Sequence, residues 1–152
     1  MDTVSPEWFD LPCPQNRRFA LFLPSRSKEG VTIRSFDRVS EATARALCAL
    51  FGGVTSYPAN GMFRRETGII QNEALVVLEC FCQVETWNQH ASSVRRLVTI
   101  LGGLLDQESV ACSLDGNMIF VSPSATDLRI NGEIEEAALA KLLSRDAMEA
   151  PR

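Results

Sequence analysis

The amino-acid sequence predicts one domain of the α+β class. Its apolar segments follow one another in the order strand, helix, hairpin, helix, strand. This is the βαββαβ order of the ferredoxin-like fold, in which one antiparallel sheet carries helices on one face. The longest predicted strand agrees with this order, because one of its sides is wholly apolar and suits the underside of helices. That side consists of Ala74, Val76, Leu78, Cys80 and Cys82.

The first half of the domain is expected to contain a strand and a helix. Residues 18–24 are predicted to form a buried strand that ends at Pro24, and residues 31–36 a short second strand or an extended lead-in. Ser40 is the expected N-cap of a helix that runs to Phe51, because apolar residues recur there at helical spacing. Gly52 then ends the helix, since glycine tolerates the left-handed conformation found at helix ends.

The second half is expected to contain two hairpins around a second helix. Residues 62–66 and 69–82 are predicted to pair across a tight turn at Thr67-Gly68, after a polar loop over residues 54–61. Thr86 and Gln89 have the spacing of a capping box at the start of the helix, which carries a Gly-Gly pair near its end. Residues 109–114 and 118–121 are predicted to form the last hairpin, with Asp115-Gly116 as its turn.

Two terminal segments are predicted to lie outside this domain of residues 17–122. Residues 1–16 contain three prolines among aromatic residues and are expected to form an extended arm. Residues 123–152 are expected to form a polar loop and a third helix, roughly residues 133–147, that packs on the domain edge or across a dimer interface. Its expected buried side consists of Ile134, Ala138, Leu139, Leu142 and Leu143.

Composition argues against several classes of function. The formal net charge is −4 and the arginines occur as isolated pairs, which disfavours a nucleic-acid partner. RNA binding on the sheet is the least favoured function of three, behind protein interaction and small-ligand binding. Glutamates occupy the positions where an RNA-binding sheet would carry lysines around its exposed aromatic residues. No apolar run approaches the roughly 18 residues of a membrane span, and residues 1–7 do not resemble a secretion signal. We therefore expect a cytoplasmic protein with no membrane partner.

The cysteines and the single histidine offer a metal site only in principle. The chain has five cysteines and no C-x-x-C pair. Cys80 and Cys82 share a strand face, so they could bind zinc together with Cys112 and His90. The favoured interpretation is that the cysteines act as small core hydrophobes, and no metal or cofactor is predicted.

Polar residues suggest a candidate ligand site. Carboxylates in an enclosed site can transfer protons or bind ligands. The candidates are Thr55, Tyr57 and Asn60 in the predicted loop, with Arg64, Glu73, Glu79, Gln107 and Glu108. Glu73 and Glu79 share a strand face but lie about 20 Å apart at about 3.3 Å per residue, so they cannot chelate one ion without a further strand or chain. Salt bridges or helix capping are favoured over catalysis, and no nucleophile with a partnering base is recognised.

Apolar residues share the face of the predicted strand that carries those two glutamates. Leu75, Val77 and Phe81 make this face too apolar to stand open and too charged for an ordinary core. We therefore expect another surface to cover this face of the sheet.

Several short motifs give the chain a resemblance to known proteins. These are Leu23-Pro24, residues 51–55 (Phe-Gly-Gly-Val-Thr), residues 61–63 (Gly-Met-Phe), residues 68–73 (Gly-x-Ile-x-x-Glu) and Gln107-Glu108. On these motifs, residues 18–122 resemble a group of short bacterial proteins of uncharacterised function. The resemblance implies a ferredoxin-like fold and no particular chemistry.

The leading functional prediction is a non-enzymatic binding or interaction module. It would self-associate as a homodimer, or dock a protein partner, through Leu75, Val77 and Phe81 on the open sheet face. The alternative is a small-ligand-binding or metal-assisted enzyme, or a ligand-sequestering protein, that uses a carboxylate-lined cavity.

Overall fold

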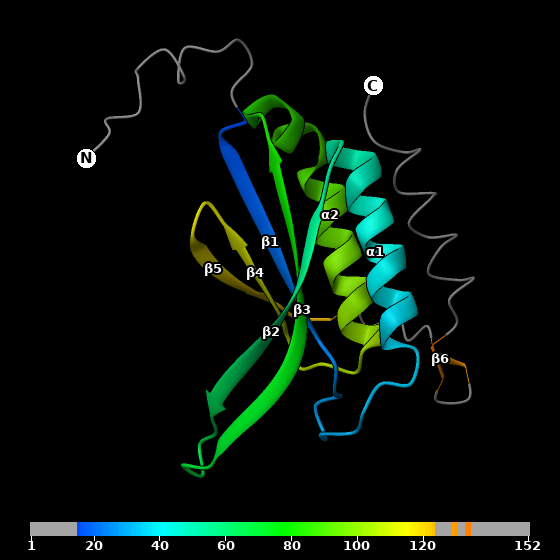
Figure 1. Cartoon of the computed structure of the whole chain (residues 1–152), viewed down its shortest axis with the longest axis vertical. Coiled ribbons are helices and arrows are strands. Elements are labelled where there is room, and N and C mark those ends of the chain that lie inside the picture. Colours follow the sequence, from blue (N-terminus) through cyan, green and yellow to red (C-terminus); the bar gives the residue numbers. More distant parts are fainter. Residues whose placement is uncertain (1–14, 124–128, 131–132, 135–152) are drawn as a thin grey trace.

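The main sheet has the predicted topology. The computed structural model describes residues 15–123, 129–130 and 133–134 (Figure 1). Five strands form one antiparallel sheet in the order β2-β3-β1-β4-β5, which confirms the ferredoxin-like α+β fold with β5 added at one edge. The elements are β1 (Arg17–Pro24), α1 (Phe36–Phe51), β2 (Thr55–Arg64), β3 (Ile70–Cys82), α2 (Val84–Leu104), β4 (Val110–Leu114) and β5 (Asn117–Val121).

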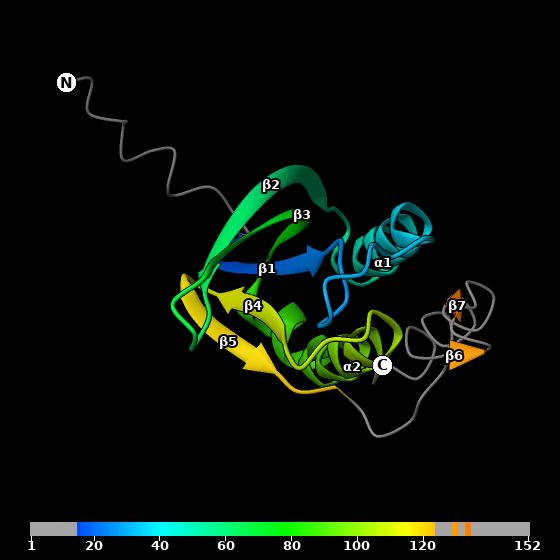
Figure 2. The same ribbon diagram turned by 90° about the horizontal axis from the view of Figure 1, so that it is seen from below.

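Both helices cover the same face of the sheet, as Figures 1 and 2 show. The core lies between this face and the helices. The apolar side of β3 points into it as predicted, with Leu78, Cys80 and Cys82 at most 2% exposed. Ala74, on the same side and nearer the hairpin turn, is exposed. Other members of the core are Leu21 and Leu23 of β1, Val39 and Leu47 of α1, and Val94, Leu97, Val98, Leu101 and Leu104 of α2.

Helix α1 begins earlier than the sequence analysis expected, with Ser35 and not Ser40 as its N-cap. Residues 31–36 form no strand: Thr32 makes one isolated bridge with Arg26, and Phe36 already belongs to the helix. The buried side of α1 begins before Ser40, because Val39, Thr43 and Leu47 are buried at a helical spacing of four residues.

The C-terminal end of α1 agrees with the prediction. Gly52 adopts φ 84° and donates its N–H to Cys48 O at 2.7 Å. This is the left-handed conformation that glycine adopts without a steric penalty. Gly52 therefore ends the helix, as the sequence predicted.

The hairpin of β2 and β3 is longer than expected. Residues 55–61, predicted as a loop, are the first part of β2 and pair in full register with β3. Pro58 is compatible with this, because β2 lies at the sheet edge and its N–H sites need no partner on the outer side. The hairpin extends past the ends of the helices in Figure 1, and Gly68 forms its turn with φ 84°.

Helix α2 also starts before its predicted cap. The helix begins at Val84 with Gln83 as N-cap and no side-chain capping bond, so the predicted capping box is wrong. Gly102 lies inside the last turn, where a Cβ atom would come within 2.9 Å of Pro123 Cβ. The chain therefore crosses α2 closely after β5. The final hairpin turns at Asp115-Gly116, both with positive φ, as predicted.

The predicted C-terminal helix starts at residues that form a short strand pair. Glu133 and Ile134 form β7 (Glu133–Ile134), which pairs with β6 (Arg129–Ile130), so a helix does not begin at Glu133. The remainder of that predicted helix, and nearly all of the N-terminal arm, fall outside the described residues. Neither α1 nor α2 is long and apolar enough to cross a membrane.

Candidate functional site

The face of the sheet opposite the helices carries a small second apolar cluster. The register sets Ala20 beside Glu79 and Phe22 beside Val77. Ala20, Leu75 and Val77 are buried here against Phe22 and Ala59. Val77 is only 2% exposed although α1 and α2 both lie on the other face (Figure 2), because Phe22 and Ala59 from the flanking strands pack against this cluster.

An ion pair lies within this face. Arg18 Nη2 and Nε contact Glu79 Oε2 at 2.7 and 3.0 Å, and the Tyr57 hydroxyl lies 3.5 Å from the same oxygen. The Glu79 side chain is 13% exposed. Its hydrogen bond and charge raise the pKa of Arg18. Glu79 is therefore a partnered structural carboxylate, as the salt-bridge interpretation predicted, and Tyr57 joins it from β2.

Around the ion pair the face exposes large apolar side chains. By strand register, Phe81 of β3 and Met118 and Phe120 of β5 share the side of the sheet that carries Arg18 and Glu79. Phe120 is 66% exposed. Of the interface candidates, Phe81 is thus available to a partner, whereas Leu75 and Val77 are buried within the monomer. The exposed large apolar residues of this face and of the adjoining hairpin tip are Tyr57, Phe63, Phe81, Met118, Phe120, Met62, Ile69 and Ile70.

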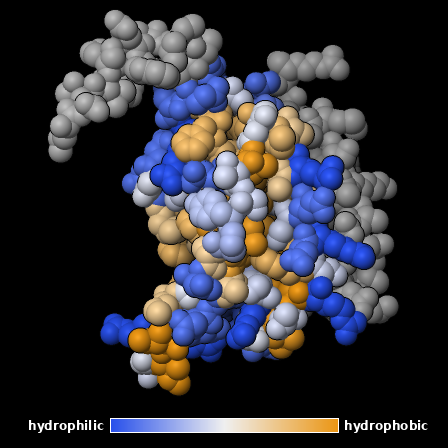
Figure 3. Space-filling model, viewed as in Figure 1, coloured by the Kyte–Doolittle hydropathy of each residue, from blue (hydrophilic) through white to orange (hydrophobic). Residues whose placement is uncertain are grey.

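The hairpin tip forms its own apolar protrusion. Met62, Ile69 and Ile70 flank the turn and are all more than half exposed. Figure 3 shows this hydrophobic tip at the lower left of the molecule, where β2 and β3 end in Figure 1.

A polar pocket of about 660 Å³ opens at the base of the tip. It lies between the loop after β1, the end of the β2–β3 hairpin and the loop after α2, and it brings together four predicted ligand residues: Arg64, Glu73, Gln107 and Glu108. Its other lining residues are Ser27, Lys28, Phe63, Arg65, Glu66, Thr67, Gln71 and Ser109.

The remaining predicted ligand residues do not reach this pocket. Tyr57 and Glu79 form the ion-pair cluster with Arg18 on the sheet face. Thr55 pairs with Glu79 in the register and is exposed at the start of β2. Asn60 pairs with Ala74, which places it on the opposite side of the hairpin from Tyr57.

Hydrogen bonds fix the walls of the polar pocket to one another. The amide Nε2 of Gln107 donates to Arg26 O at 2.6 Å and to Leu105 O at 2.8 Å. Glu73 Oε1 accepts the backbone N–H of Arg26 at 3.1 Å, which ties the hairpin to the loop after β1. Because both residues bond to Arg26 backbone atoms, the pocket is shaped before any ligand arrives.

The carboxyl group of Glu73 is partly buried at the wall of this pocket. Burial raises its pKa, and this outweighs the opposing hydrogen bond and charge of Arg26. A raised pKa at a pocket wall marks a candidate binding group, because a cationic ligand would restore the charged form.

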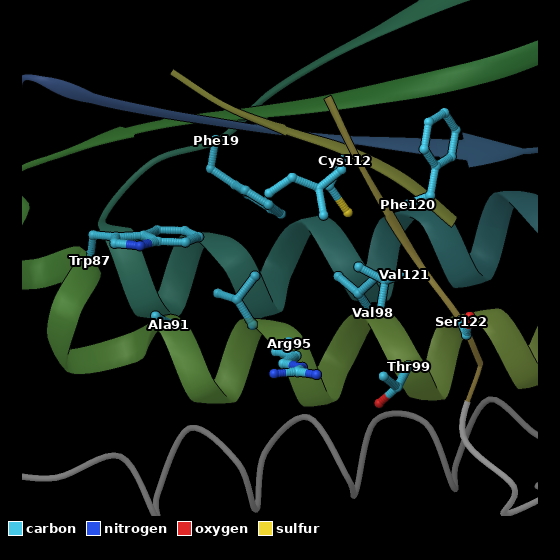
Figure 4. Close-up of a pocket in the computed structure, with 12 residues that line it drawn as sticks. Phe19, Trp87, Ala91, Arg95, Val98, Thr99, Cys112, Phe120, Val121 and Ser122 are labelled. Carbon is cyan, nitrogen blue, oxygen red and sulfur yellow. The ribbon is translucent and has the colours of Figure 1, made fainter. Parts of the chain in front are cut away.

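A second pocket, of about 530 Å³, was not predicted from the sequence. It lies between α2 and the β4–β5 hairpin and is mainly apolar (Figure 4). Phe19 and Trp87 line one end, and Val121 and Ser122 the other. Sequence spacing could not reveal it, because it depends on how far β5 stands from α2.

The cysteine side chains of the sheet are core residues. Burial raises the pKa of Cys80 and of Cys112 to about 12, so neither forms a thiolate at neutral pH. Cys48 is exposed on α1. Within the described ranges, no group of three His, Cys, Asp or Glu side chains is arranged to hold a metal ion.

Comparison with known proteins supports the fold. No protein-family model and no curated protein sequence matches the chain. A solved phage SAM lyase in complex with S-methyl-5′-thioadenosine is similar to it, with a TM-score of 0.51 and 13% identity over 72% of this chain and 92% of that one. CutA from Synechococcus elongatus PCC7942 gives a TM-score of 0.40 and 15% identity over 89% of this chain and 93% of that one.

At 13% identity, the likeness to the phage SAM lyase shows a shared fold and nothing finer. The ferredoxin-like fold that the sequence motifs implied is confirmed by the sheet topology. Membership of the group of short bacterial proteins stays a prediction, because no family model matches the chain.

Proposed function

We propose that the protein is an interaction module that self-associates through its open sheet face and hairpin tip. The observation that carries this proposal is the distribution of exposed large apolar residues. Ten such residues occur among those described, and eight of them lie on this face or at the tip. Exposed apolar residues that gather on one face and one protrusion support an interaction surface, whereas singly scattered apolar residues need no explanation.

A second copy of this chain is the partner that we favour. The centre of the face is an internally satisfied ion pair, so a covering surface need not supply an opposite charge. A copy of the same face offers aromatic and Met side chains at the periphery, which are enriched at protein interfaces.

The oligomeric state of two matched variants tests this. Phe120→Lys places a charge on the exposed face, and Val31→Lys places one at a residue of similar exposure, 63% against 66%, in the loop after β1. We expect sedimentation velocity to show an oligomer for the wild type and for Val31→Lys, and a shift toward monomer for Phe120→Lys. Val77→Lys is a poor test, since Val77 is buried and its replacement would disturb folding.

A monodisperse monomer at all concentrations would refute self-association. An oligomer that Phe120→Lys and Phe81→Lys leave intact would place the interface elsewhere.

A second candidate function is small-ligand binding in the polar pocket, favoured by the four predicted ligand residues that line it. Its volume lies within the roughly 300–1,000 Å³ typical of ligand pockets. S-methyl-5′-thioadenosine is the first compound to test, because the similar phage SAM lyase was solved with it. A ligand that binds the folded state raises the melting temperature, so a thermal-shift experiment with the wild type and Glu73→Gln is sufficient. An unchanged melting temperature would count against this compound.

A further inference from the structure

The apolar pocket between α2 and the β4–β5 hairpin leaves part of the helix side of the sheet uncovered. Ile119 pairs with Cys112, so both side chains lie on that side. Cys112 is 2% exposed there, but Ile119 is 46% exposed. The other wall comes from α2, through apolar residues three or four positions apart that share one side of the helix: Trp87, Ala91, Val94 and Val98. Apolar surface on both walls suits an apolar occupant.

The N-terminal segment of the chain joins the domain at one end of this pocket. β1 begins at Arg17, and Phe19 two residues later lines the pocket, with its ring centroid 5.3 Å from that of Trp87. Arg17 Nη1 donates to Asp115 Oδ2 at 2.8 Å, which holds the start of β1 beside the β4–β5 turn. Residues 1–14 are therefore attached to the domain beside the pocket.

This segment is long enough to follow the whole pocket. From Asn16 back to Trp8, an extended proline-rich chain spans about 25 Å at about 3.1 Å per residue. The pocket wall on α2, from Trp87 to Thr99, is about 18 Å long at about 1.5 Å per residue. Residues 8–16 can thus run along the pocket from one end to the other.

The sequence of the segment suits an apolar groove. Three prolines among residues 6–14 favour the polyproline II conformation, which repeats every three residues and loses little entropy on binding. In that conformation Trp8 and Leu11 would share one side of the segment, and Glu7 and Asp10 would share another. The segment would therefore present an apolar side and an acidic side.

The pocket wall carries a cation that complements the acidic side. Arg95 belongs to the lining, and Figure 4 shows it on α2, across the pocket from Phe19 and Cys112 of the sheet. In the part of the chain that the structure describes, its guanidinium has no ion-pair or hydrogen-bond partner. Residues 1–14 contain acidic side chains and neither Lys nor Arg. A surface ion pair adds little affinity, so the apolar contacts would hold the segment and Arg95 would fix its position.

We propose that residues 6–14 dock in the apolar pocket of their own chain. Trp8 and Leu11 lie between α2 and β5, where they cover Ile119, and the acidic side of the segment lies toward Arg95. The inference does not depend on self-association, because the open sheet face lies on the other side of the sheet.

Fluorine NMR of the full chain tests this docking. The sequence has two tryptophans, so labelling with 5-fluorotryptophan gives two resonances, and Trp8→Phe assigns them. A soluble paramagnetic agent broadens the resonance of an exposed ring. A labelled peptide of residues 1–16 supplies the fully exposed reference for Trp8. We expect the Trp8 resonance to be broadened strongly in the peptide and only weakly in the full chain.

Two neighbouring residues of β5 provide matched variants. Ile119→Lys places a charge in the pocket, and Met118→Lys places one on the opposite face of the sheet at a residue of similar exposure, 53% against 46%. Ile119→Lys should remove the protection of Trp8, and Met118→Lys should leave it unchanged. Arg95→Glu should lower the ratio of docked to undocked segment about 2- to 5-fold, the value of a surface ion pair. Circular dichroism confirms that each variant is folded.

The exposure of Trp8 decides the proposal. A Trp8 ring that is as exposed in the full chain as in the peptide would overturn it, and would leave a second copy or another segment as the cover of the pocket. Protection that survives Ile119→Lys, or that Met118→Lys removes equally, would place Trp8 elsewhere. Protection that appears only as the protein concentration rises would show docking on a second copy and overturn docking within one chain.

Discussion

Replacement of Gly102 by alanine has two opposite effects on stability, a gain in helix propensity and a loss from steric overlap. In an open helix the change stabilises by about 1 kcal/mol, because glycine is a poor helix former. Here the added Cβ atom would lie 2.9 Å from Pro123 Cβ, 3.1 Å from Pro123 Cα and 3.4 Å from Val110 Cγ2. The two proline atoms belong to a ring and backbone that cannot rotate away. Overpacking of this kind costs about 1–3 kcal/mol, so we expect a net destabilisation of about 0–2 kcal/mol.

Urea denaturation followed by circular dichroism measures this difference. Gly53→Ala is the matched control, since Gly53 has no positive φ and its Cβ would meet nothing within 4 Å. It should be neutral or slightly stabilising, by at most about 1 kcal/mol. A Gly102→Ala variant that gains stability as much as an open helix position does would refute the close approach of Pro123 to α2.

Three further outcomes follow from the core and the turns. Native alkylation with peptide mass spectrometry should label Cys48 quickly and leave Cys80 and Cys112 unmodified until the protein unfolds, and rapid labelling of either would contradict their burial. Burial raises the pKa of Glu73 above its ordinary 4.5, so its contribution to stability is greatest below that pH and is lost as pH rises through the folded-state pKa. Urea melts at several pH values should therefore show wild type losing stability relative to Glu73→Gln over this range, and a constant difference would exclude the shift. Asp115→Ala should cost about 1–2 kcal/mol by urea denaturation, because Asp115 Oδ1 accepts the Arg18 N–H at 2.9 Å and φ is 52° in the turn; a neutral result would contradict this.

The strand order and the buried side of β3 could be predicted because strong local patterns encode them. Alternation over residues 70–82 and the Asp115-Gly116 turn each favour one local structure. The start of α1 could not be predicted from Ser40, because a serine that resembles a cap can also lie inside a helix with its hydroxyl buried. The strand over residues 55–61 could not be predicted because polar residues and Pro58 are typical of turns, and edge position overrides that preference.

The candidate ligand residues are all polar or charged, but the structure places them at different sites. Arg64, Glu73, Gln107 and Glu108 meet because the hairpin passes close to the loop after α2, which no periodicity encodes. Glu79 lies apart from them with Arg18, whose pairing with it depends on the register of β1 against β3.

The first strand of the chain lies in the middle of the sheet, and this affects the order of folding. β1 pairs with β3 on one side and with β4 on the other, so its neighbours are synthesised about 50 to 90 residues later. Contacts of such sequence separation are slow to form, and until β4 emerges from the ribosome β1 has at most one of its two partners. During synthesis, the apolar side chains of Phe19, Leu21 and Leu23 therefore remain only partly packed until the rest of the core has been made. A chain that stops before residue 110 would leave one edge of β1 open, and such fragments should aggregate.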